Sequence, residues 1–361
     1  MVEINKKNVD FAKWGSKGNF GKSYNMPNRR YILTTIFLLL VICLKAQTIT
    51  TLQQGKPTSI RGLSVVDDKV AWVSGSKGTI GLSTDGGSNW IWQQIKGFEK
   101  SDFRDIEAFS DKEAVIISSG SPAYILKTID GGTSWNIKYQ KTDTAYFLDA
   151  MDFADKLHGF VLGDPINNKF LLLETIDGGE TWKPAVNPPT ALKDEAAFAA
   201  SGTCLRVDKT ITIVTGGSNS RILTSPVGGK AWTTKELPLT NGTGSRGAFS
   251  VAYGGYQKVI VGGNYANDKQ TDSVAYLLPQ KNANYKNNIP VVGPAGYQSC
   301  VEYIKDNTFL STGTSGTNIT KDGGKVWLKI DDNSYNVCRK AKNGSLVILA
   351  GDRGKIAVLK F

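Results

Sequence analysis

Thr128-Ile-Asp-Gly-Gly-Thr-Ser-Trp135 is an eight-residue stretch whose pattern returns along most of the chain. The pattern combines a hydroxyl, an Asp two positions later, a Gly-Gly pair and a Trp five positions after the Asp. Asp can accept hydrogen bonds from the amides of its own turn, and Gly adopts positive φ at little steric cost, so Asp-Gly-Gly is typical of a tight hairpin. The Trp then returns a large apolar ring to the base of that hairpin, where Ile125 and Leu126 are its expected partners.

Three further copies begin at Ser83, Thr175 and Thr320, and a degenerate copy at Ser225 has Val227 in place of the Asp. Positions 85, 130, 177 and 227 are 45, 47 and 50 residues apart, and the 95 residues from 227 to 322 leave room for one unmarked unit. Self-similarity at a period of about 20 to 50 residues is typical of propellers, solenoids and arrays. A residue that recurs once per unit serves the turn itself, so we expect a structural role for Asp85, Trp90, Asp130, Trp135, Asp177, Trp182, Trp232, Asp322 and Trp327.

Short β-prone segments divide the chain into seven units that begin near residues 59, 102, 146, 195, 247, 296 and 334. The fourth unit is expected to form its first strand from Ala-Ala-Phe-Ala-Ala-Ser-Gly (196–202), and the fifth has no Asp turn. The seventh ends at Phe361 with only three strands, which residues 48–54 would complete. The sequence therefore predicts an all-β fold, a seven-bladed β-propeller over residues 47–361 that is closed by an N-terminal strand in the last blade.

The N-terminal part has the pattern of an export signal. Arg29 and Arg30 precede an apolar run from Ile32 to Leu44, which is too short to span a bilayer comfortably and is typical of a secretory signal peptide. We predict a signal peptide at residues 26–46 that is cleaved after Ala46. Residues 1–25 are interpreted as an upstream extension or a misplaced start. The mature chain is then expected to be extracytoplasmic, either periplasmic or secreted, with no membrane span.

The charge of the chain argues against a nucleic-acid partner. The 361 residues carry a formal net charge of +11, but eight of the 43 basic and two of the 32 acidic residues lie in residues 1–46. This leaves 35 basic against 30 acidic residues in the remainder, with no basic run. Such a mixed surface is a solvated one and does not predict nucleic-acid binding. We also expect the chain to be a monomer.

At its Asp-Gly-Gly-x-x-Trp turns the sequence resembles the Asp-box or BNR-repeat propellers, which include sialidases, xyloglucanase-type hydrolases and sortilin-type receptors. It looks closer still to the bacterial, non-photosynthetic relatives of the photosystem II stability/assembly factor family. The matching phrases include Arg61-Gly-Leu-Ser, Asp102-Phe-Arg-Asp-Ile-Glu, Gly163-Asp-Pro, Glu195-Ala-Ala-Phe-Ala-Ala-Ser-Gly-Thr and Gly262-Gly-Asn-Tyr. The resemblance implies an exported propeller. Its members are often labelled glycosyl-hydrolase-like or oxidoreductase-like, and the photosynthetic members act as assembly chaperones.

Several kinds of catalytic site lack support in the sequence. His158 is the only histidine, so no zinc-type spacing exists and a Ser-His-Asp triad would depend on that one residue. No Gly-x-Gly-x-x-Gly motif follows a strand and opens a helix, so a nicotinamide cofactor has no support. We therefore expect neither a metal nor a cofactor.

Three arginines, Arg61, Arg104 and Arg246, occupy similar places in units one, two and five, just ahead of the inner strand. One reading is that they pair with neighbouring acids, for example Arg104 with Asp102 or Asp105. The functional reading is a polar binding face, because arginine forks and aromatic rings suit anions, sugars and peptides. The residues assigned to this face are Arg61, Arg104, Asp105, Asp149, Asp164, Glu195, Arg246, Tyr265 and Tyr297.

Two functions follow from these observations. The favoured one is a non-catalytic propeller that binds a protein or glycan partner as a scaffold or assembly factor. The alternative is a sialidase- or xyloglucanase-like glycoside hydrolase, with Asp105, Asp149, Asp164 and Glu195 as candidate carboxyl groups at the channel mouth. Cys300 and Cys338 share a register in adjacent units, and the sequence leaves open whether they are bonded.

Overall fold

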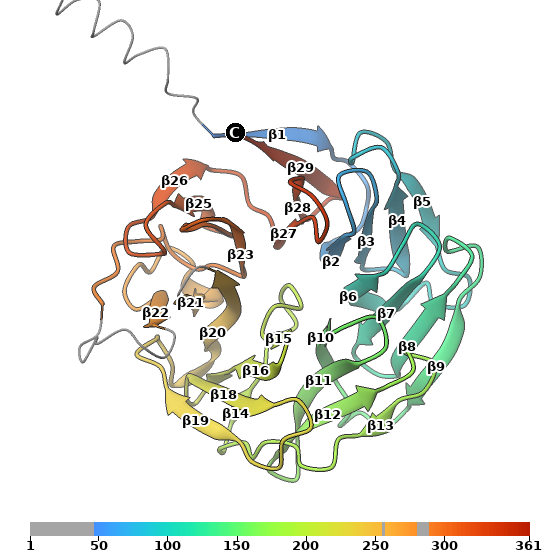
Figure 1. Cartoon of the computed structure of the whole chain (residues 1–361), viewed down its shortest axis with the longest axis horizontal. Coiled ribbons are helices and arrows are strands. Elements are labelled where there is room, and N and C mark those ends of the chain that lie inside the picture. Colours follow the sequence, from blue (N-terminus) through green and yellow to red (C-terminus); the bar gives the residue numbers. More distant parts are fainter. Residues whose placement is uncertain (1–46, 255–256, 280–288) are drawn as a thin grey trace, which may run out of the picture. The chain divides into compact units, whose positions relative to one another are not determined.

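The computed structural model describes residues 47–361 except 255–256 and 280–288, and these described residues form seven antiparallel sheets around a central axis (Figure 1). They contain no α-helix and a single 3-10 turn, η1 (Tyr265–Asn267). The predicted all-β, seven-bladed propeller is confirmed. The predicted extension (1–25) and signal peptide (26–46) lie outside the described residues.

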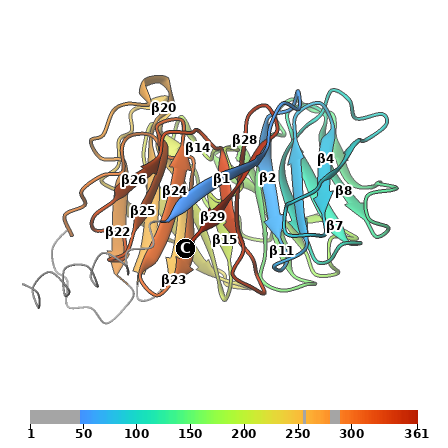
Figure 2. The ribbon, with the colours of Figure 1, turned by 90° about the horizontal axis from the view of Figure 1, so that it is seen from above.

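Four blades follow one plan, in which successive strands run from the axis outward (Figures 1 and 2). Blade 1 contains β2 (Ile60–Val65), β3 (Ala71–Gly75), β4 (Thr79–Ser83) and β5 (Ile91–Gln94). Blade 2 contains β6 (Asp102–Ala108), β7 (Ala114–Ser119), β8 (Ala123–Thr128) and β9 (Asn136–Lys141). Blade 3 contains β10 (Leu148–Phe153), β11 (Gly159–Ile166), β12 (Lys169–Thr175) and β13 (Lys183–Pro184). Blade 6 contains β23 (Cys300–Lys305), β24 (Thr308–Gly313), β25 (Gly316–Thr320) and β26 (Leu328–Asp331).

Blades 4 and 5 depart from this plan. Blade 4 contains β15 (Leu205–Val207), β16 (Thr210–Val214), β18 (Arg221–Pro226) and β19 (Thr233–Glu236). Blade 5 contains β20 (Thr243–Gly254), β21 (Gln257–Asn264) and β22 (Ala275–Pro279), and the two-residue strands β14 (Glu195–Ala196) and β17 (Gly216–Gly217) extend its inner edge. The expected strand at 196–202 is therefore wrong, because the inner strand of blade 4 begins only at Leu205.

Blade 7 contains the last strands of the chain together with the first. β27 (Val337–Lys340), β28 (Val347–Gly351) and β29 (Lys355–Lys360) are followed in the sheet by β1 (Thr48–Gln53). β1 runs antiparallel to β29, with Thr48 opposite Lys360 and Gln53 opposite Ile356 (Figures 1 and 2). The two ends of residues 47–361 therefore lie side by side in one sheet.

The repeated Asp-Gly-Gly corner is a closed hydrogen-bond unit. Thr128 Oγ1 donates to Asp130 Oδ1 at 2.8 Å and accepts from the Gly132 amide at 3.0 Å. Asp130 also accepts from the Ser134 amide at 2.9 Å. The Ser134 hydroxyl, which donates to Asp130 Oδ2 at 2.6 Å, together with the Ser134 amide and Thr128 Oγ1 holds the pKa of Asp130 down, to about 2. The same bonds recur around Asp85, Asp177 and Asp322, so the carboxylates serve their own turns, as the sequence predicts.

The second glycine of each corner also rests on the preceding blade. Both glycines of the corner have positive φ, 75° at Gly131 and 82° at Gly132. A methyl group placed on Gly132 would lie 3.1 Å from Ile80 Cδ1 and 3.3 Å from the Trp72 ring, both in blade 1. The equivalent glycines meet blade 7 (Gly87), blade 2 (Gly179) and blade 5 (Gly324) in the same way. The corner therefore joins neighbouring blades as well as closing its hairpin.

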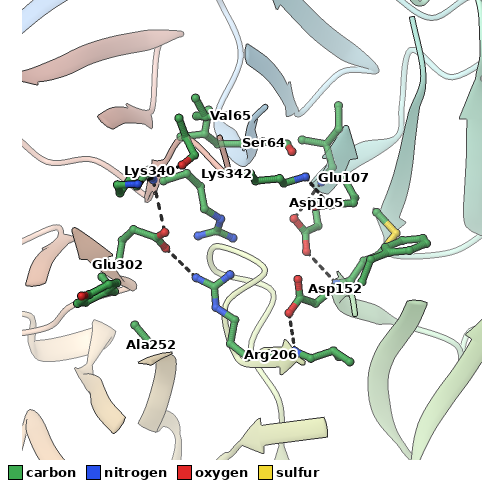
Figure 3. Close-up of a pocket in the computed structure, with 18 of the residues that line it drawn as sticks. Ser64, Val65, Asp105, Glu107, Asp152, Arg206, Ala252, Glu302, Lys340 and Lys342 are labelled. Atoms are coloured by element: carbon green, nitrogen blue, oxygen red, sulfur yellow. Dashed lines mark hydrogen bonds and ion pairs between the residues drawn. The ribbon is translucent and has the colours of Figure 1, made fainter. Parts of the chain in front are cut away.

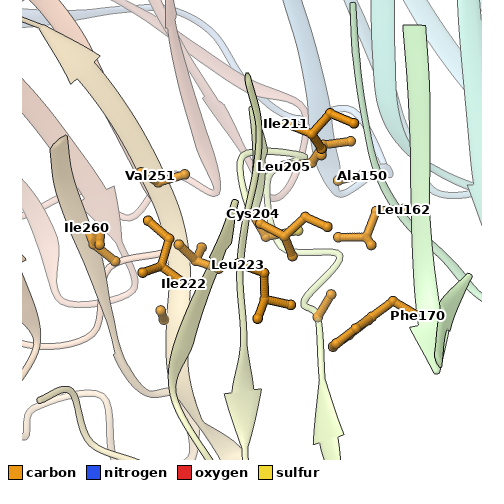
Figure 4. Close-up of a cluster of buried hydrophobic side chains, with 14 of the residues drawn as sticks. Ala150, Leu162, Phe170, Cys204, Leu205, Ile211, Ile222, Leu223, Val251 and Ile260 are labelled. Atoms are coloured by element: carbon orange, nitrogen blue, oxygen red, sulfur yellow. The ribbon is translucent and has the colours of Figure 1, made fainter. Parts of the chain in front are cut away.

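The tryptophans of the corners and the buried apolar side chains also lie between neighbouring blades. Trp135 packs against the cluster that includes Leu126 of its own blade, whereas Ile125 belongs to another cluster, and the Trp135 ring meets the Trp72 ring of blade 1 edge-on, with 6.3 Å between centroids. The largest cluster of buried side chains joins blades 3, 4 and 5 and includes Phe170, Cys204 and Ile260 (Figure 4). Most of the apolar surface that stabilises the ring is thus buried where two sheets face each other.

The two glycines of one corner offer a matched test of this contact. Gly131→Ala adds only the cost of a side chain at positive φ, because its nearest neighbour, the Asp111 carbonyl oxygen, would be 3.4 Å away. Gly132→Ala adds the overlap with Ile80 and Trp72. We expect a loss of about 1 kcal/mol for the first variant and a further 1 to 2 kcal/mol for the second in urea unfolding. Equal losses would contradict the inter-blade role of Gly132.

Candidate binding cavity at the start of the inner strands

The centre of the ring holds two cavities at opposite ends of the innermost strands. The first, of about 530 Å³, is lined by residues at or before the beginnings of these strands, and we call it the start-side cavity. The second, of about 410 Å³, is lined by residues at or after their ends, and we call it the end-side cavity. Every inner strand runs in the same direction around the axis, so residues at equivalent positions of different blades meet in one cavity.

Residues 197–204 separate the two cavities, and we call them the plug. The plug connects β14 to β15 and lies inside the ring, where its yellow-green trace is visible in Figure 1. Polar groups from six blades hold it. These contacts are Arg61 to Ala200 O, Arg104 to Ala199 O, Asp149 to the Ala199 amide, Ser250 to Thr203, Ser299 O to Ser201 and Arg339 to Ser201 O.

Two guanidinium groups face the start-side cavity. Arg104 Nε pairs with Asp102 at 2.7 Å, so the simple reading of an arginine with a neighbouring acid holds for this residue. Arg61 differs, because its one hydrogen bond runs to the Ala200 carbonyl at 3.3 Å and no ion pair involves it among the described residues. Burial and the charge of Arg104 lower the pKa of Arg61 from its usual value. The cavity therefore contains a half-buried positive charge without a carboxylate partner.

Asp149 and Asp164 form an acid pair in the same cavity. They come from neighbouring strands, β10 and β11, and Asp149 Oδ2 and Asp164 Oδ1 are buried without a hydrogen-bond partner in the described structure. Burial, and then the charge of Asp164, raise the pKa of Asp149 well above its usual value. Burial also raises the pKa of Asp164 to about 6. Two nearby carboxyl groups with raised pKa values share protons near neutral pH.

Aromatic side chains form another wall of the start-side cavity. Phe198 and Phe249 stack with ring centroids 3.8 Å apart, and Tyr297 meets Phe249 edge-on at 4.8 Å. Tyr265 completes the group and keeps 54% of its surface exposed. Such a wall can pack against an apolar side chain or a sugar ring.

The cavity brings together six of the nine residues assigned to the binding face from the sequence: Arg61, Arg104, Asp149, Asp164, Tyr265 and Tyr297. The other three lie elsewhere. Glu195 is buried and pairs with Arg221 at 2.8 and 2.5 Å, because that guanidinium reaches it across the inner edge of blades 4 and 5. Asp105 accepts from the Ile106 and Met151 amides and lines the end-side cavity. Arg246 does not line either cavity, and its Nε is buried without a partner in the described structure.

Sequence reasoning missed the two phenylalanines, Phe198 and Phe249, and the plug itself. Phe198 stands in Ala-Ala-Phe-Ala-Ala, which was read as a strand because it contains apolar residues at the expected place in the repeat. The small residues around it were the available signal. Alanine is a poor strand former, and a segment of small residues can cross a narrow channel.

The end-side cavity has balanced charges, shown in Figure 3. Arg206 pairs with Glu302 at 2.8 Å, and Lys342 pairs with Glu107 (Figure 3). Burial raises the pKa of Asp105 to about 7 and that of Asp152 to about 6. Its walls carry four basic and four acidic side chains, of which two pairs form ion pairs, whereas Arg339 and Lys340 bond to backbone carbonyls.

The described residues contain neither a cluster of metal-binding side chains nor a membrane-spanning helix. Within 47–361, apart from 255–256 and 280–288, no group of three or more His, Cys, Asp or Glu side chains is placed to hold a metal ion. In the same ranges no helix is long and apolar enough to cross a membrane.

Comparison with known proteins agrees with the resemblance expected from the sequence. Residues 47–142 match a family model described as photosynthesis system II assembly factor YCF48. No curated protein matches the chain by sequence.

Solved structures share the fold at low sequence identity. A structure described as YCF48 bound to D1 peptide is 15% identical, with a TM-score of 0.62 over 88% of this chain and 96% of its own. YCF48 from Cyanidioschyzon merolae is 16% identical, with a TM-score of 0.58 over 86% of this chain and 98% of its own. The Pan2 WD40 domain of Neurospora crassa is 14% identical, with a TM-score of 0.59 over 88% and 96%. These likenesses establish the fold, and the family match rests on the repeat over 47–142. The chain is a seven-bladed β-propeller, and its residues 47–142 are similar to the YCF48 assembly-factor family.

Proposed function

We propose that the chain binds an anionic peptide segment of a protein partner in the start-side cavity and acts as a scaffold or assembly factor. One observation carries this proposal. Arg61 lines a cavity of about 530 Å³ and is held there only by a backbone carbonyl, next to a second guanidinium. A guanidinium group that is partly removed from water and has no carboxylate partner can form an ion pair with an anionic ligand.

The rest of the cavity agrees with a peptide ligand. The aromatic wall of Phe198, Phe249, Tyr265 and Tyr297 lies in the same cavity as the two arginines. A carboxylate on the guanidinium groups and an apolar side chain on the rings would bury both kinds of surface at once. An acidic glycan has the same two properties and is the other ligand class that this geometry accommodates.

The comparisons favour a protein partner over a glycan. A structural relative is described as bound to a peptide, and the matching family is described as an assembly factor. Those descriptions belong to the relatives. They support a peptide for this chain because the two share a fold over 88% of this chain and because Arg61 has no carboxylate partner in the start-side cavity.

Export belongs to the same proposal. The basic pair Arg29-Arg30 and the apolar run from Ile32 to Leu44 support a signal peptide, and the partner would then lie in the periplasm or outside the cell. We propose that the mature chain works there as a monomer.

Glycoside hydrolysis is the second candidate, because Asp149 and Asp164 are unpaired carboxyl groups in a cavity. Hydrolysis needs two carboxyl groups on either side of the scissile bond, about 5 to 9.5 Å apart. Asp149 and Asp164 come from adjacent strands of one blade, on one wall of the cavity. Their arrangement therefore favours ligand binding over cleavage.

The proposal is tested with Arg61→Ala combined with Arg104→Ala. The probe is a labelled pool of synthetic peptides in which one Glu stands beside one Phe or Leu, measured by fluorescence anisotropy. Loss of two charge-assisted contacts should weaken binding by about a hundredfold. The melting temperature should fall only modestly, because the variant loses two long hydrogen bonds to the plug, at 3.3 and 3.4 Å, and one partly exposed ion pair.

Arg353→Ala is the matched control, because Arg353 is exposed and lines neither cavity. It should bind the pool as the unmodified chain does. A second pool with Gln in place of Glu should bind weakly to every variant. Tight binding of the Glu pool to the double variant would refute the site.

The acid pair predicts how binding depends on pH. Below about pH 6 the pair keeps a proton, since burial raises the pKa of Asp164 to about 6 and that of Asp149 also lies above its usual value. As the pH rises through about 6, Asp164 ionises, and its charge repels an anionic ligand whose own Glu is already charged. Affinity for the Glu pool should therefore fall about tenfold between pH 6 and about pH 8.

Asp149→Asn with Asp164→Asn should remove this fall, and binding should remain tight at high pH. An unchanged pH profile in the double variant would contradict the assignment. The same variant separates the two candidate functions. If the unmodified chain cleaves fluorogenic glycosides and the double variant does not, the chain is a hydrolase.

A further inference from the structure

The three cysteines of residues 47–361 are all buried, and two of them meet between blades. Cys300 begins β23 in blade 6, and Cys338 lies in β27 of blade 7. Their sulfur atoms are 3.7 Å apart. Formation of a disulfide would bring them to about 2 Å, which requires a movement of less than about 2 Å. Cys204, in the plug, belongs to a different cluster with residues of blades 3, 4 and 5.

The surroundings distinguish the two thiols of the pair. The sulfur of Cys300 lies 3.4 Å from the Cys338 amide nitrogen, 3.4 Å from Arg339 Nη1 and 3.8 Å from Thr203 Oγ1, all potential donors. When protonated, Cys300 can instead donate to the Cys338 carbonyl at 3.3 Å. Burial opposes ionisation, but the Cys338 thiol, the charge of Arg339 and the Cys338 amide together lower the pKa of Cys300.

Cys338 and Cys204 have the opposite tendency. Burial, followed by its neighbour Cys300, raises the pKa of Cys338. Burial, followed by the charge of Asp149, raises the pKa of Cys204. Since the thiolate is the reactive form, Cys300 is the nucleophile of the three and Cys338 is placed to react with its oxidised form.

We propose that Cys300 and Cys338 form a dithiol site that a small hydroperoxide converts to a disulfide between blades 6 and 7. The Cys300 thiolate attacks one peroxide oxygen, the O–O bond breaks, and hydroxide leaves, so Cys300 becomes a sulfenic acid. The Cys338 sulfur then attacks the Cys300 sulfur, the S–O bond breaks, and water leaves with the Cys338 proton. The two thiols lose two electrons in total, and the peroxide gains them.

Access requires only a short path through the protein. The neighbours of the two cysteines in sequence line the two cavities, Ser299 the start-side cavity and Arg339 the end-side cavity. Hydrogen peroxide is small and uncharged, and the residues next to the two cysteines are the ones that line the cavities. A protein oxidant would require a blade to separate from the ring.

The disulfide would change two parts of the molecule. It would join blade 7, which holds both β1 and β29, covalently to blade 6. It would also remove the Cys300 thiolate, which is the anionic acceptor for Arg339 and Thr203. Arg339 also holds the plug through Ser201 O at 2.8 Å, and Thr203 belongs to the plug. Oxidation of the pair would therefore change the contacts of Arg339 and Thr203, which hold the plug in place.

The test treats the folded full chain with hydrogen peroxide, blocks remaining thiols under denaturing conditions and maps the peptides by mass spectrometry without reduction. We expect one linked pair of peptides containing Cys300 and Cys338, two hydrogens lighter than the sum of the reduced peptides, with Cys204 still free to be alkylated. The unfolding temperature should rise by several degrees, about 3 to 8 °C, and return after reduction.

Two variants keep the result interpretable. Cys338→Ser should stop at a Cys300 sulfenic acid that dimedone traps, because the second thiol is missing. Cys204→Ser should form the same linked pair as the unmodified chain. The proposal is overturned if all three thiols of the unmodified chain remain alkylatable, if Cys204 oxidises as fast as Cys300, or if Cys300 proceeds only to sulfinic acid with no linked peptide.

Discussion

The contact on which the ring depends is the one between the second glycine of each Asp-Gly-Gly corner and the buried side chains of the preceding blade. A hairpin turn alone would only return a strand to its own sheet. Because Gly132 has no Cβ, its backbone approaches Ile80 and Trp72 closely enough for the Trp135 ring to pack against Trp72 as well. The same unit then closes a turn, spaces two sheets and buries an indole ring.

Blades without a complete corner use other contacts. In the degenerate corner, Trp232 donates to the Asn187 carbonyl at 2.7 Å instead of to a glycine of its own turn. Blade 7 has no corner of its own and instead receives β1 beside β29. These joints keep every inner strand in the same direction, so Arg61 and Arg104 from two blades reach one cavity. The binding chemistry is thus a consequence of how neighbouring blades pack.

The plug divides the centre of the ring into two cavities, so the described part of the ring has no continuous channel. Its backbone groups would be costly to bury unpaired, and side chains of four blades satisfy several of them. Among these partners, Arg61 and Arg104 use part of their donor capacity on plug carbonyls and retain the rest for the cavity. The same segment separates a cavity with unpaired positive charge from one in which Arg206 and Glu302 already pair.

Much of the fold could be predicted from the sequence, because the Asp-Gly-Gly-x-x-Trp corner is local chemistry that recurs at a fixed period. The site could be predicted only in part. Arg61 and Arg104 occupy equivalent positions of the repeat, so the sequence indicates that they lie close together. Glu195 instead pairs with Arg221, which lies 26 residues away, and no local sequence pattern predicts that pair. The plug was read as a strand because repeat position suggested one, and only the closed ring shows that 197–204 cross its centre.

Hydrogen–deuterium exchange of the full chain, with and without the Glu-containing peptide pool, tests the central claim most directly. If the corners align the blades so that an anion binds at the beginnings of the inner strands, the peptide should slow exchange in residues 60–62, 102–104 and 197–200. Residues 337–342, at the opposite end of the axis, should exchange at the same rate in both samples. Slower exchange confined to 337–342, or no change in the plug, would contradict the account.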